Sequence, residues 1–177
     1  NSGISDSEKA ASKTSQRLEE RLRQLEEYVL TALESDGCLD DLPEDMVIYR
    51  YENDSLLAWS NQFPLMNDNI RSRLMTQRLT SFNNRLYPPL AKVTEQISYM
   101  NLGPKWYVVR SSEGEGNVKV IAGLEIKNTL IDDLRKSENG VNPHLRLNKG
   151  FSVVPITTSG GSCVSIGDIP LFKVICE

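Results

Sequence analysis

The residues with the clearest chemical potential lie in one turn-rich stretch, SGGSCVSIG at 159–167. A serine or cysteine nucleophile needs a neighbouring base, and the G-x-S-x-G elbow that presents such a nucleophile in many hydrolases is absent. The single histidine of the chain, His144, lies in the loop sequence NPHLRL. A Cys163–His144 dyad would require the two residues to meet in space, whereas a turn between two strands explains the glycines without catalysis. We therefore expect no catalytic residue, and we keep a thiol or hydrolytic enzyme as the third hypothesis.

Other ligand-binding patterns are incomplete. The segment SSEGEGN at 111–117 has two glycines but lacks the lysine and hydroxyl that end a phosphate loop. Carboxylate pairs at 40–41, 44–45 and 132–133 lack the spacing of a calcium loop. The sequence thus predicts no metal site and no cofactor.

Three cysteines, Cys38, Cys163 and Cys176, have no metal-ligand spacing. Buried, reduced thiols are the simpler interpretation, because free cysteine is among the most buried residue types. A Cys163–Cys176 bridge is the alternative, and an odd count leaves at least one thiol unpaired.

The composition sets the class of protein. The chain has 177 residues, of which 39% are hydrophobic and 25% charged, as in one globular domain. A net charge of −4 argues against a nucleic-acid partner, because phosphate binding needs clustered cations. No apolar run is long enough to span a bilayer. The chain begins without methionine and stops directly after the strand-like LFKVIC, so we expect a segment excised from a longer protein.

A long helix is predicted over residues 5–35. Ser5 and Glu8 have the spacing of a capping box, and Gly37 stands where a helix would end. Apolar and small residues recur in steps of four and three, which is a heptad seam. The seam consists of Ala11, Ser15, Leu18, Leu22, Leu25, Val29 and Ala32.

Two arrangements of this helix are open. Its strongest stretch, Leu18, Leu22, Leu25 and Val29, is the predicted dimer interface with a second copy. The alternative is a helix that lies on the sheet of its own domain. In a combination of the two, Leu30 and Leu33 pack inward while the earlier seam pairs between chains.

The remaining elements alternate hairpins with helices. Segment 46–63 reads as a hairpin about Asn53-Asp54, with Ile48 opposite Trp59 and Tyr51 opposite Leu56. Residues 68–97 carry a broken helical pattern, and a second hairpin, WYVVRSSEGEGNVKVIAGLEIK, covers 106–127. A short helix at 128–140 and strands at 150–157 and 169–176 follow.

Hairpins in place of parallel crossovers predict a mainly antiparallel sheet. The expected fold class is therefore α+β: a long N-terminal helix followed by a mainly antiparallel sheet with covering helices. The expected division is 1–37, the long helix, and 38–177, the sheet domain.

Three stretches of the chain carry recognisable motifs: NDSL at 53–56 with Trp59-Ser60, WYVV at 106–109, and AGLEIKN at 122–128. These motifs resemble those of the extracytoplasmic sensor regions of bacterial membrane histidine kinases. The C-terminal IPLFKV resembles the last strand of that family, which leads into a transmembrane helix. Pro104-Lys105 stands where the family pattern has a glycine before the tryptophan.

The resemblance implies a PAS-like or CACHE-like sensor domain in a two-component signal-transduction protein. Such a domain would lie on the periplasmic face of the bacterial inner membrane, with membrane anchors on both sides of this segment. The long helix would be membrane-proximal, the receptor a homodimer, and the partner an unknown small-molecule or protein stimulus. The alternative from another class is a structural or dimerisation module without a ligand pocket.

In a PAS-like sheet the ligand lies between one sheet face and its covering helices. Trp59, Arg110 and Tyr51 are the predicted ligand-binding residues, since an indole, a fixed cation and a phenol within an apolar wall suit a small molecule. Strand parity places Tyr51 and Trp59 on opposite faces of the first hairpin. The prediction therefore favours Trp59 with Arg110.

Overall fold

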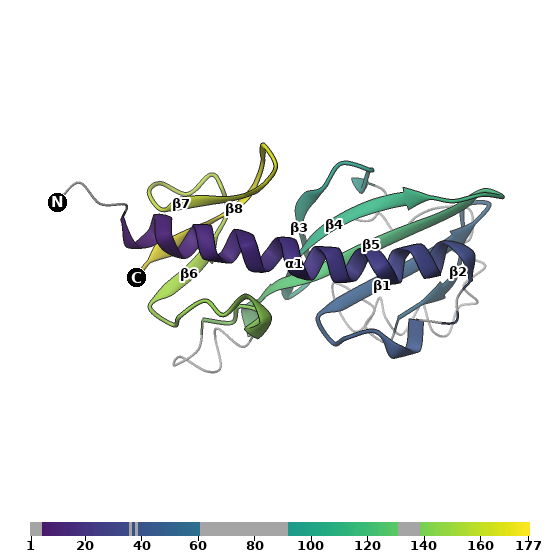
Figure 1. Cartoon of the computed structure of the whole chain (residues 1–177), viewed down its shortest axis with the longest axis horizontal. Helices are drawn as coiled ribbons and strands as arrows, with labels where there is room; N and C mark the ends of the chain where they lie inside the picture. Colours follow the sequence, from purple (N-terminus) through teal and green to yellow (C-terminus); the bar gives the residue numbers. More distant parts are fainter. Residues whose placement is uncertain (1–4, 36, 38, 61–91, 131–138) are drawn as a thin grey trace. The chain divides into compact units, whose positions relative to one another are not determined.

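The computed structural model describes residues 5–35, 37, 39–60, 92–130 and 139–177. The chain forms two compact units: the sheet unit, Gln24–Glu125, and the terminal unit, which combines Asn1–Arg23 with Ile126–Glu177. Helix α1 (Asp6–Glu34) and strand β5 (Val118–Asn128) each contribute to both units (Figure 1). The structure therefore divides within the helix and within a strand, and the expected division at residue 37 does not coincide with it.

The sheet unit contains a five-stranded sheet in the order β2-β1-β5-β4-β3. The pairs β1 with β2, β1 with β5 and β3 with β4 are antiparallel. Its elements are the 3₁₀ helix η1 (Leu39–Asp41) and strands β1 (Met46–Glu52), β2 (Ser55–Trp59), β3 (Ser98–Leu102), β4 (Lys105–Glu113) and β5. The predicted fold class, α+β with a long N-terminal helix ahead of a mainly antiparallel sheet, is confirmed.

The first hairpin departs from its predicted register at one point. Tyr51 pairs with Leu56 as expected, but Trp59 pairs with Tyr49 and not with Ile48. The register shifts at a bulge between Arg50 and Tyr51. Because a bulge places one extra residue on one strand, it reverses the alternation of side chains beyond it.

Residue types explain the turns of this sheet. Asn53 and Asp54 both have positive φ, 51° and 65°, and Asn and Asp tolerate this region better than other non-glycine residues. Strand β3 was not predicted as a separate strand. Gly103, with φ 72°, allows the tight turn by which β3 pairs with β4.

Helix α1 begins at the predicted cap. The Glu8 amide donates to Ser5 Oγ at 3.2 Å, and Ser5 Oγ donates to Glu8 Oε1 at 3.3 Å. The first bond satisfies one of the amides that the first helical turn leaves free, and the second joins the two side chains. Ser5 is therefore confirmed as the residue that caps the helix, in contact with Glu8 as the spacing predicts.

The heptad seam of α1 faces inward. Leu18 is fully buried, Leu25 and Val29 are each 4% exposed, and Leu22 is half-buried. The seam predicted as a dimer interface is thus covered by the chain itself, which is the intramolecular alternative. Leu30 is 58% exposed, so the expectation that it packs inward is wrong.

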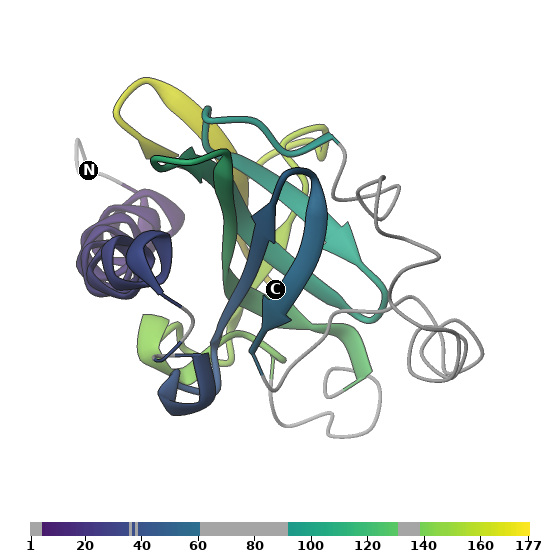
Figure 2. The same cartoon turned by 90° about the vertical axis from the view of Figure 1, so that its right-hand side faces the viewer.

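In the sheet unit, the last turns of α1 lie along one face of the five-stranded sheet (Figure 2). Met46, Ile48 and Arg50 of β1 point to this face, opposite Leu124, Ala122 and Val120 of β5. These six residues are all buried. Alternate residues of β1 and β5 therefore form the surface on which the helix packs.

The terminal unit contains a three-stranded sheet in the order β6-β8-β7. Its elements are the 3₁₀ helix η4 (Pro143–Leu145) and strands β6 (Phe151–Val154), β7 (Ser162–Ile166) and β8 (Ile169–Cys176). The prediction that 158–168 is only a turn is wrong, because β7 lies within it. Glycines with positive φ at 160, 161 and 167 flank this short strand and give it its turns.

Two further predictions fall at the limits of the described residues. Thr129 and Leu130 are helical, and the Leu130 amide donates to Asn128 Oδ1 at 3.0 Å, so Asn128 caps the start of the predicted short helix. Residues 131–138 and most of 68–97 lie outside the described residues. Within the described part of the chain, no helix has the length and apolar character needed to cross a membrane.

Candidate functional site

One face of the five-stranded sheet carries a cluster of aromatic side chains, here called the aromatic face. Tyr49, Tyr51 and Tyr107 are each 1% exposed at its centre. Trp59 and Met100 pack against this centre and are partly buried. The remaining buried members are Val47, Leu56, Val93, Leu102, Val109 and Ile121.

Burial raises the pKa of all three phenols of the aromatic face. Burial raises the pKa of Tyr49 well above its ordinary value, and the neighbouring Tyr107 and Tyr51 raise it further. Burial alone raises the pKa of Tyr51. The three side chains belong to one buried cluster, so their hydroxyls stay neutral inside an apolar wall.

A carboxylate lies beside this group. Burial raises the pKa of Tyr107, and the negative charge of Glu125 raises it further. Glu125 Oε1 also forms an ion pair with Lys105 Nζ at 2.9 Å, with the Glu125 side chain 15% exposed. The aromatic face therefore combines neutral phenols with a partly buried acid whose charge Lys105 balances.

This arrangement suits binding and not covalent chemistry. Phenols with raised pKa values stay protonated and act as hydrogen-bond donors and acceptors, and they are poor bases or nucleophiles at neutral pH. An apolar wall with a few polar groups is the usual composition of a small-molecule site. Because Lys105 balances the charge of Glu125, the aromatic face favours a neutral ligand.

Two of the three predicted ligand-binding residues meet here. Tyr51 belongs to the cluster, and Trp59 packs against it. The prediction that these two lie on opposite faces is wrong, because the bulge after Arg50 reverses the parity of the hairpin. Arg110 is exposed and alternates on β4 with the buried Val109, which faces the cluster. The favoured combination of Trp59 with Arg110 is therefore not brought together.

Sequence reasoning missed Tyr49, Tyr107 and Glu125. Tyr49 and Tyr51 are two residues apart on β1, and period-two spacing alone places them on one face. That signal was present in the sequence. The proximity of Glu125 to Tyr107 depends on how β5 lies beside β4, which single-strand patterns do not give.

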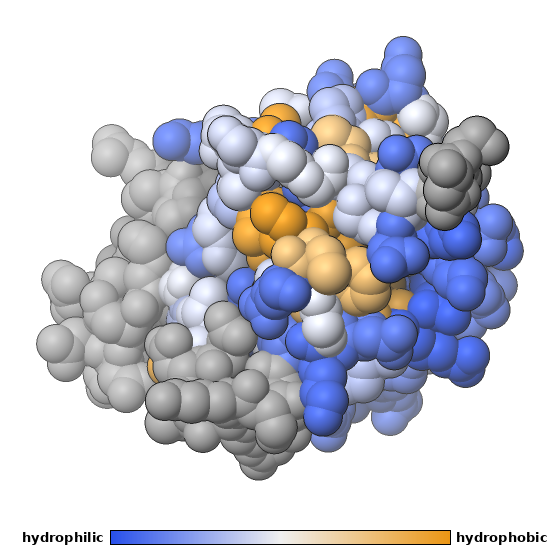
Figure 3. Space-filling view, turned by 90° about the vertical axis from the view of Figure 1, so that its left-hand side faces the viewer, coloured by the Kyte–Doolittle hydropathy of each residue, from blue (hydrophilic) through white to orange (hydrophobic). Residues whose placement is uncertain are grey.

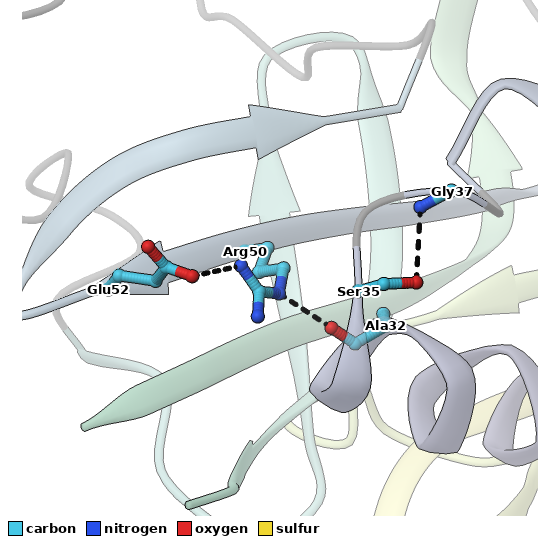
Figure 4. A network of polar contacts seen from close by, with 5 residues as sticks. All are labelled: Ala32, Ser35, Gly37, Arg50 and Glu52. Atoms are coloured by element: carbon cyan, nitrogen blue, oxygen red, sulfur yellow. Dashed lines mark hydrogen bonds and ion pairs between the residues drawn. The ribbon is translucent and has the colours of Figure 1, made fainter. Parts of the chain in front are cut away.

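The opposite face of the sheet is joined to α1 by one arginine. Arg50, 9% exposed, donates from Nε to the Ala32 carbonyl at 2.7 Å and from Nη1 to Glu52 Oε1 at 2.5 Å (Figure 4). The last four carbonyls of a helix have no intrahelical partner, so Arg50 satisfies a group near the end of α1. Its neighbours on β1, Tyr49 and Tyr51, point to the aromatic face.

A second aromatic pair lies away from the cluster. Trp106 stacks on Tyr99 with ring centroids 4.9 Å apart and an interplanar angle of 19°. Trp106 alternates with Tyr107 along β4 and so lies on the opposite face from the aromatic face. Trp59 and Trp106 thus report on different faces of the same sheet.

The residues considered for catalysis are exposed on the surface of their unit. Cys163 and Cys176 are free and exposed, so the expectation that they are buried is wrong. His144 is exposed in η4, where its amide donates to Asn142 Oδ1 at 3.0 Å. Among the described residues, no three His, Cys, Asp or Glu side chains gather as metal ligands would.

Apolar residues on the surface do not define a docking site. Figure 3 shows one face of the molecule, where hydrophobic residues appear in a central area and again above it, with hydrophilic residues around them. In the described ranges, the large exposed hydrophobic residues are Leu30, Leu57, Leu130 and Ile156, which belong to four different segments. Scattered exposed apolar residues are ordinary on protein surfaces.

Comparisons with models of protein families, with curated proteins and with solved structures found no match for this chain. The fold and the site therefore define the class: an α+β domain whose antiparallel sheet has a helix on one face and a cluster of buried phenols on the other.

Proposed function

We propose that this chain is the non-catalytic, extracytoplasmic sensor domain of a bacterial membrane histidine kinase, with the aromatic face as its stimulus-binding surface. The observation that carries the proposal is the alternation along β1. Tyr49 and Tyr51 point to the aromatic face, and Arg50 between them donates to the Ala32 carbonyl of α1 at 2.7 Å. A ligand that displaces β1 thereby changes a contact to the long helix.

The energetic requirement on such a ligand is modest. A two-state equilibrium shifts only by the difference in ligand affinity between its states, and a few kcal/mol is sufficient. Removing the charge-assisted bond between Arg50 and the helix carbonyl would cost about 1.5–3 kcal/mol, which is of that order. We propose that the signal leaves the domain along α1 toward the membrane, within a homodimeric receptor anchored on both sides of this segment.

The two tryptophans provide the test of where a stimulus binds. A panel of small neutral molecules is screened by thermal shift on the 177-residue chain, and each hit is repeated on Trp59→Phe and Trp106→Phe. The expected result is a loss of most of the shift in Trp59→Phe only, because Trp59 packs against the aromatic face and Trp106 lies opposite. A hit weakened equally by both substitutions, or only by Trp106→Phe, contradicts this surface.

The parent protein is tested by the coding sequence on either side of this segment. We expect an apolar span of about 20 residues before and after it, and a kinase core downstream. Flanking sequence without such spans would remove the receptor proposal and leave the domain without a membrane role.

A structural or dimerisation module is the second candidate. The burial of Tyr49, Tyr51 and Tyr107, each 1% exposed, favours it, since buried aromatics commonly serve as core anchors. A scaffold predicts that no compound in the panel gives a shift dependent on Trp59. The same experiment therefore separates the two functions.

A further inference from the structure

The terminal unit contains a hollow with an unusual charge. Four cations, Lys9, Lys13, Arg17 and Arg146, line it together with one carboxylate, Asp6. The hollow measures about 380 Å³. The whole chain carries a net charge of −4, so an excess of positive side chains at one place requires an explanation beyond composition.

The helix brings three of these cations to one side. Lys9, Lys13 and Arg17 are four residues apart in sequence, and residues at this spacing lie above one another on a helix surface. Like charges at this spacing repel one another. An anion placed between them would convert that repulsion into attraction.

Arg146 is held in place from the other side of the hollow. Arg17 Nη1 donates to the carbonyls of Leu145 and Arg146, each at 3.1 Å. Arg146 itself has φ 50° and ψ 39°, the left-handed region that suits glycine or asparagine better than arginine. An arginine therefore occupies position 146 in a backbone conformation that disfavours this residue type.

A buried hydroxyl completes the observation. Thr14 lines the hollow and is fully buried, and its Oγ1 has no hydrogen-bond partner among the described residues. Buried polar groups in folded proteins almost always have a partner. Asn148 adds an amide to the lining, and Phe151 adds an apolar wall.

We propose that this hollow binds an oxyanion of the phosphate class, carried on a small organic molecule or a lipid headgroup. Four cations against one carboxylate favour a group with several charged oxygens over a single carboxylate, and guanidinium groups bind phosphate oxygens in a forked geometry. The volume is within the range of small-molecule sites. This site lies in the terminal unit, and the inference does not depend on the function proposed for the aromatic face.

Inorganic pyrophosphate is the probe for the free ligand. Its binding to the 177-residue chain is measured by titration calorimetry at constant ionic strength, with chloride as the competing anion. Lys13→Gln combined with Arg146→Asn should weaken binding by about tenfold or more, since two charged hydrogen bonds are lost. Asparagine accepts the left-handed backbone of position 146, so this variant is expected to keep its fold.

The matched control removes two positive charges outside the hollow. Lys149→Gln combined with Lys92→Gln changes the net charge equally at two exposed positions that do not line the hollow. Its affinity for pyrophosphate should stay within about twofold of the unchanged chain, because neither lysine lines the hollow and exposed charges are screened by salt. Equal weakening in both double variants would show attraction to overall charge and would overturn the site.

Thr14→Val tests the buried hydroxyl. This substitution removes the unpartnered group while nearly keeping the shape, so the melting temperature without ligand should stay or rise. Pyrophosphate binding should fall by a few-fold, since an oxygen of the ligand loses the Thr14 hydroxyl as its hydrogen-bond donor. A variant with unchanged affinity would exclude Thr14 from the site.

Vesicles distinguish the two sources of the oxyanion. Sedimentation with vesicles of phosphatidylglycerol is compared with sedimentation with neutral phosphatidylcholine, with and without pyrophosphate. Binding only to the anionic vesicles, lost in Lys13→Gln with Arg146→Asn, assigns the site to a lipid headgroup. Pyrophosphate binding without vesicle binding assigns it to a soluble anion, and the absence of both overturns the proposal.

Discussion

The candidate site is built mainly from buried tyrosines. Their burial should make the stability of the sheet unit fall at high pH. Burial raises the pKa of Tyr51, Tyr99 and Tyr107 above the ordinary value of 10.0, and it raises that of Tyr49 still more clearly. In the unfolded chain these groups lose their protons near pH 10. In the folded chain they keep them to higher pH.

The sign of the effect follows from proton binding. Above about pH 10 the folded state binds more protons than the unfolded state, so the free energy of unfolding falls as pH rises. Below the pKa of tyrosine in the unfolded chain, the four phenols are protonated in both states and contribute no pH dependence to the stability. The free energy of unfolding begins to fall near pH 10 and continues to fall until the pH passes the raised pKa values of the folded state.

Tyr49→Phe tests this contribution. Removing one phenol should reduce the slope of unfolding free energy against pH by up to about 1.4 kcal/mol per pH unit, the equivalent of one proton. Urea unfolding at several pH values between 9 and 11 measures the slope. Tyr28→Phe, at a half-buried position of α1, is the control, and an identical change in both variants would contradict a special role of the aromatic face.

At the scale of residues, the sequence predicted Tyr51 and Trp59 as site residues. It favoured Trp59 with Arg110, whereas the structure brings Trp59 together with Tyr51. Alternation along a strand is local, and along β4 it is enough to place Arg110 on the side opposite Val109. The bulge in the first hairpin left no signature that parity could use, and it brought Trp59 to the side of Tyr51. The neutral phenol group also required knowing that β1 lies beside β5, which is a tertiary fact.

At the scale of elements, α1 was predicted almost to the residue because its start, its end and its periodicity agree. What its seam contacts was not predictable, since the same heptad pattern serves a coiled coil and a helix on a sheet. The short strands β3 and β7 were missed for a related reason. Each has five residues, and glycine turns beside them dominate the local pattern.

The buried and exposed sides of α1 allow a matched pair of substitutions on one helix. Leu25→Ala removes a side chain that is 4% exposed, and it should lower the free energy of unfolding by about 2–4 kcal/mol. Leu30→Ala makes the same change at a residue that is 58% exposed, and its effect should stay within about 0.5 kcal/mol. Urea unfolding of both variants measures the difference.

Protein concentration distinguishes an internal seam from one that joins two copies. Packing within one chain makes the effect of Leu25→Ala the same at all concentrations. A seam that joins two copies would make both the stability and the effect of the substitution increase with concentration. The latter result would restore Leu18, Leu22, Leu25 and Val29 as the dimer interface.

At the scale of the whole molecule, two elements belong to both compact units: α1 and β5. An element with residues in two cores links their stabilities, because breaking it removes packing from each. The helix is also the route by which the proposed sensor would transmit its signal. Its continuity at the boundary between Arg23 and Gln24 is therefore testable as a property of the entire chain.

A glycine pair at exposed positions beside this boundary tests that continuity. Glu20→Gly with Arg23→Gly should lower helix stability by about 2 kcal/mol relative to Glu20→Ala with Arg23→Ala, which removes the same charges. Trp59 and Trp106 fluorescence reports the sheet unit, and hydrogen exchange of the β8 amides reports the terminal unit. In the alanine pair the two reporters should unfold together as denaturant rises. In the glycine pair they should separate, with one unit opening first, because helix continuity no longer links the two cores. If the reporters stay coincident in the glycine pair, β5 alone couples the units, and α1 is not the element through which a change at the aromatic face reaches the rest of the protein.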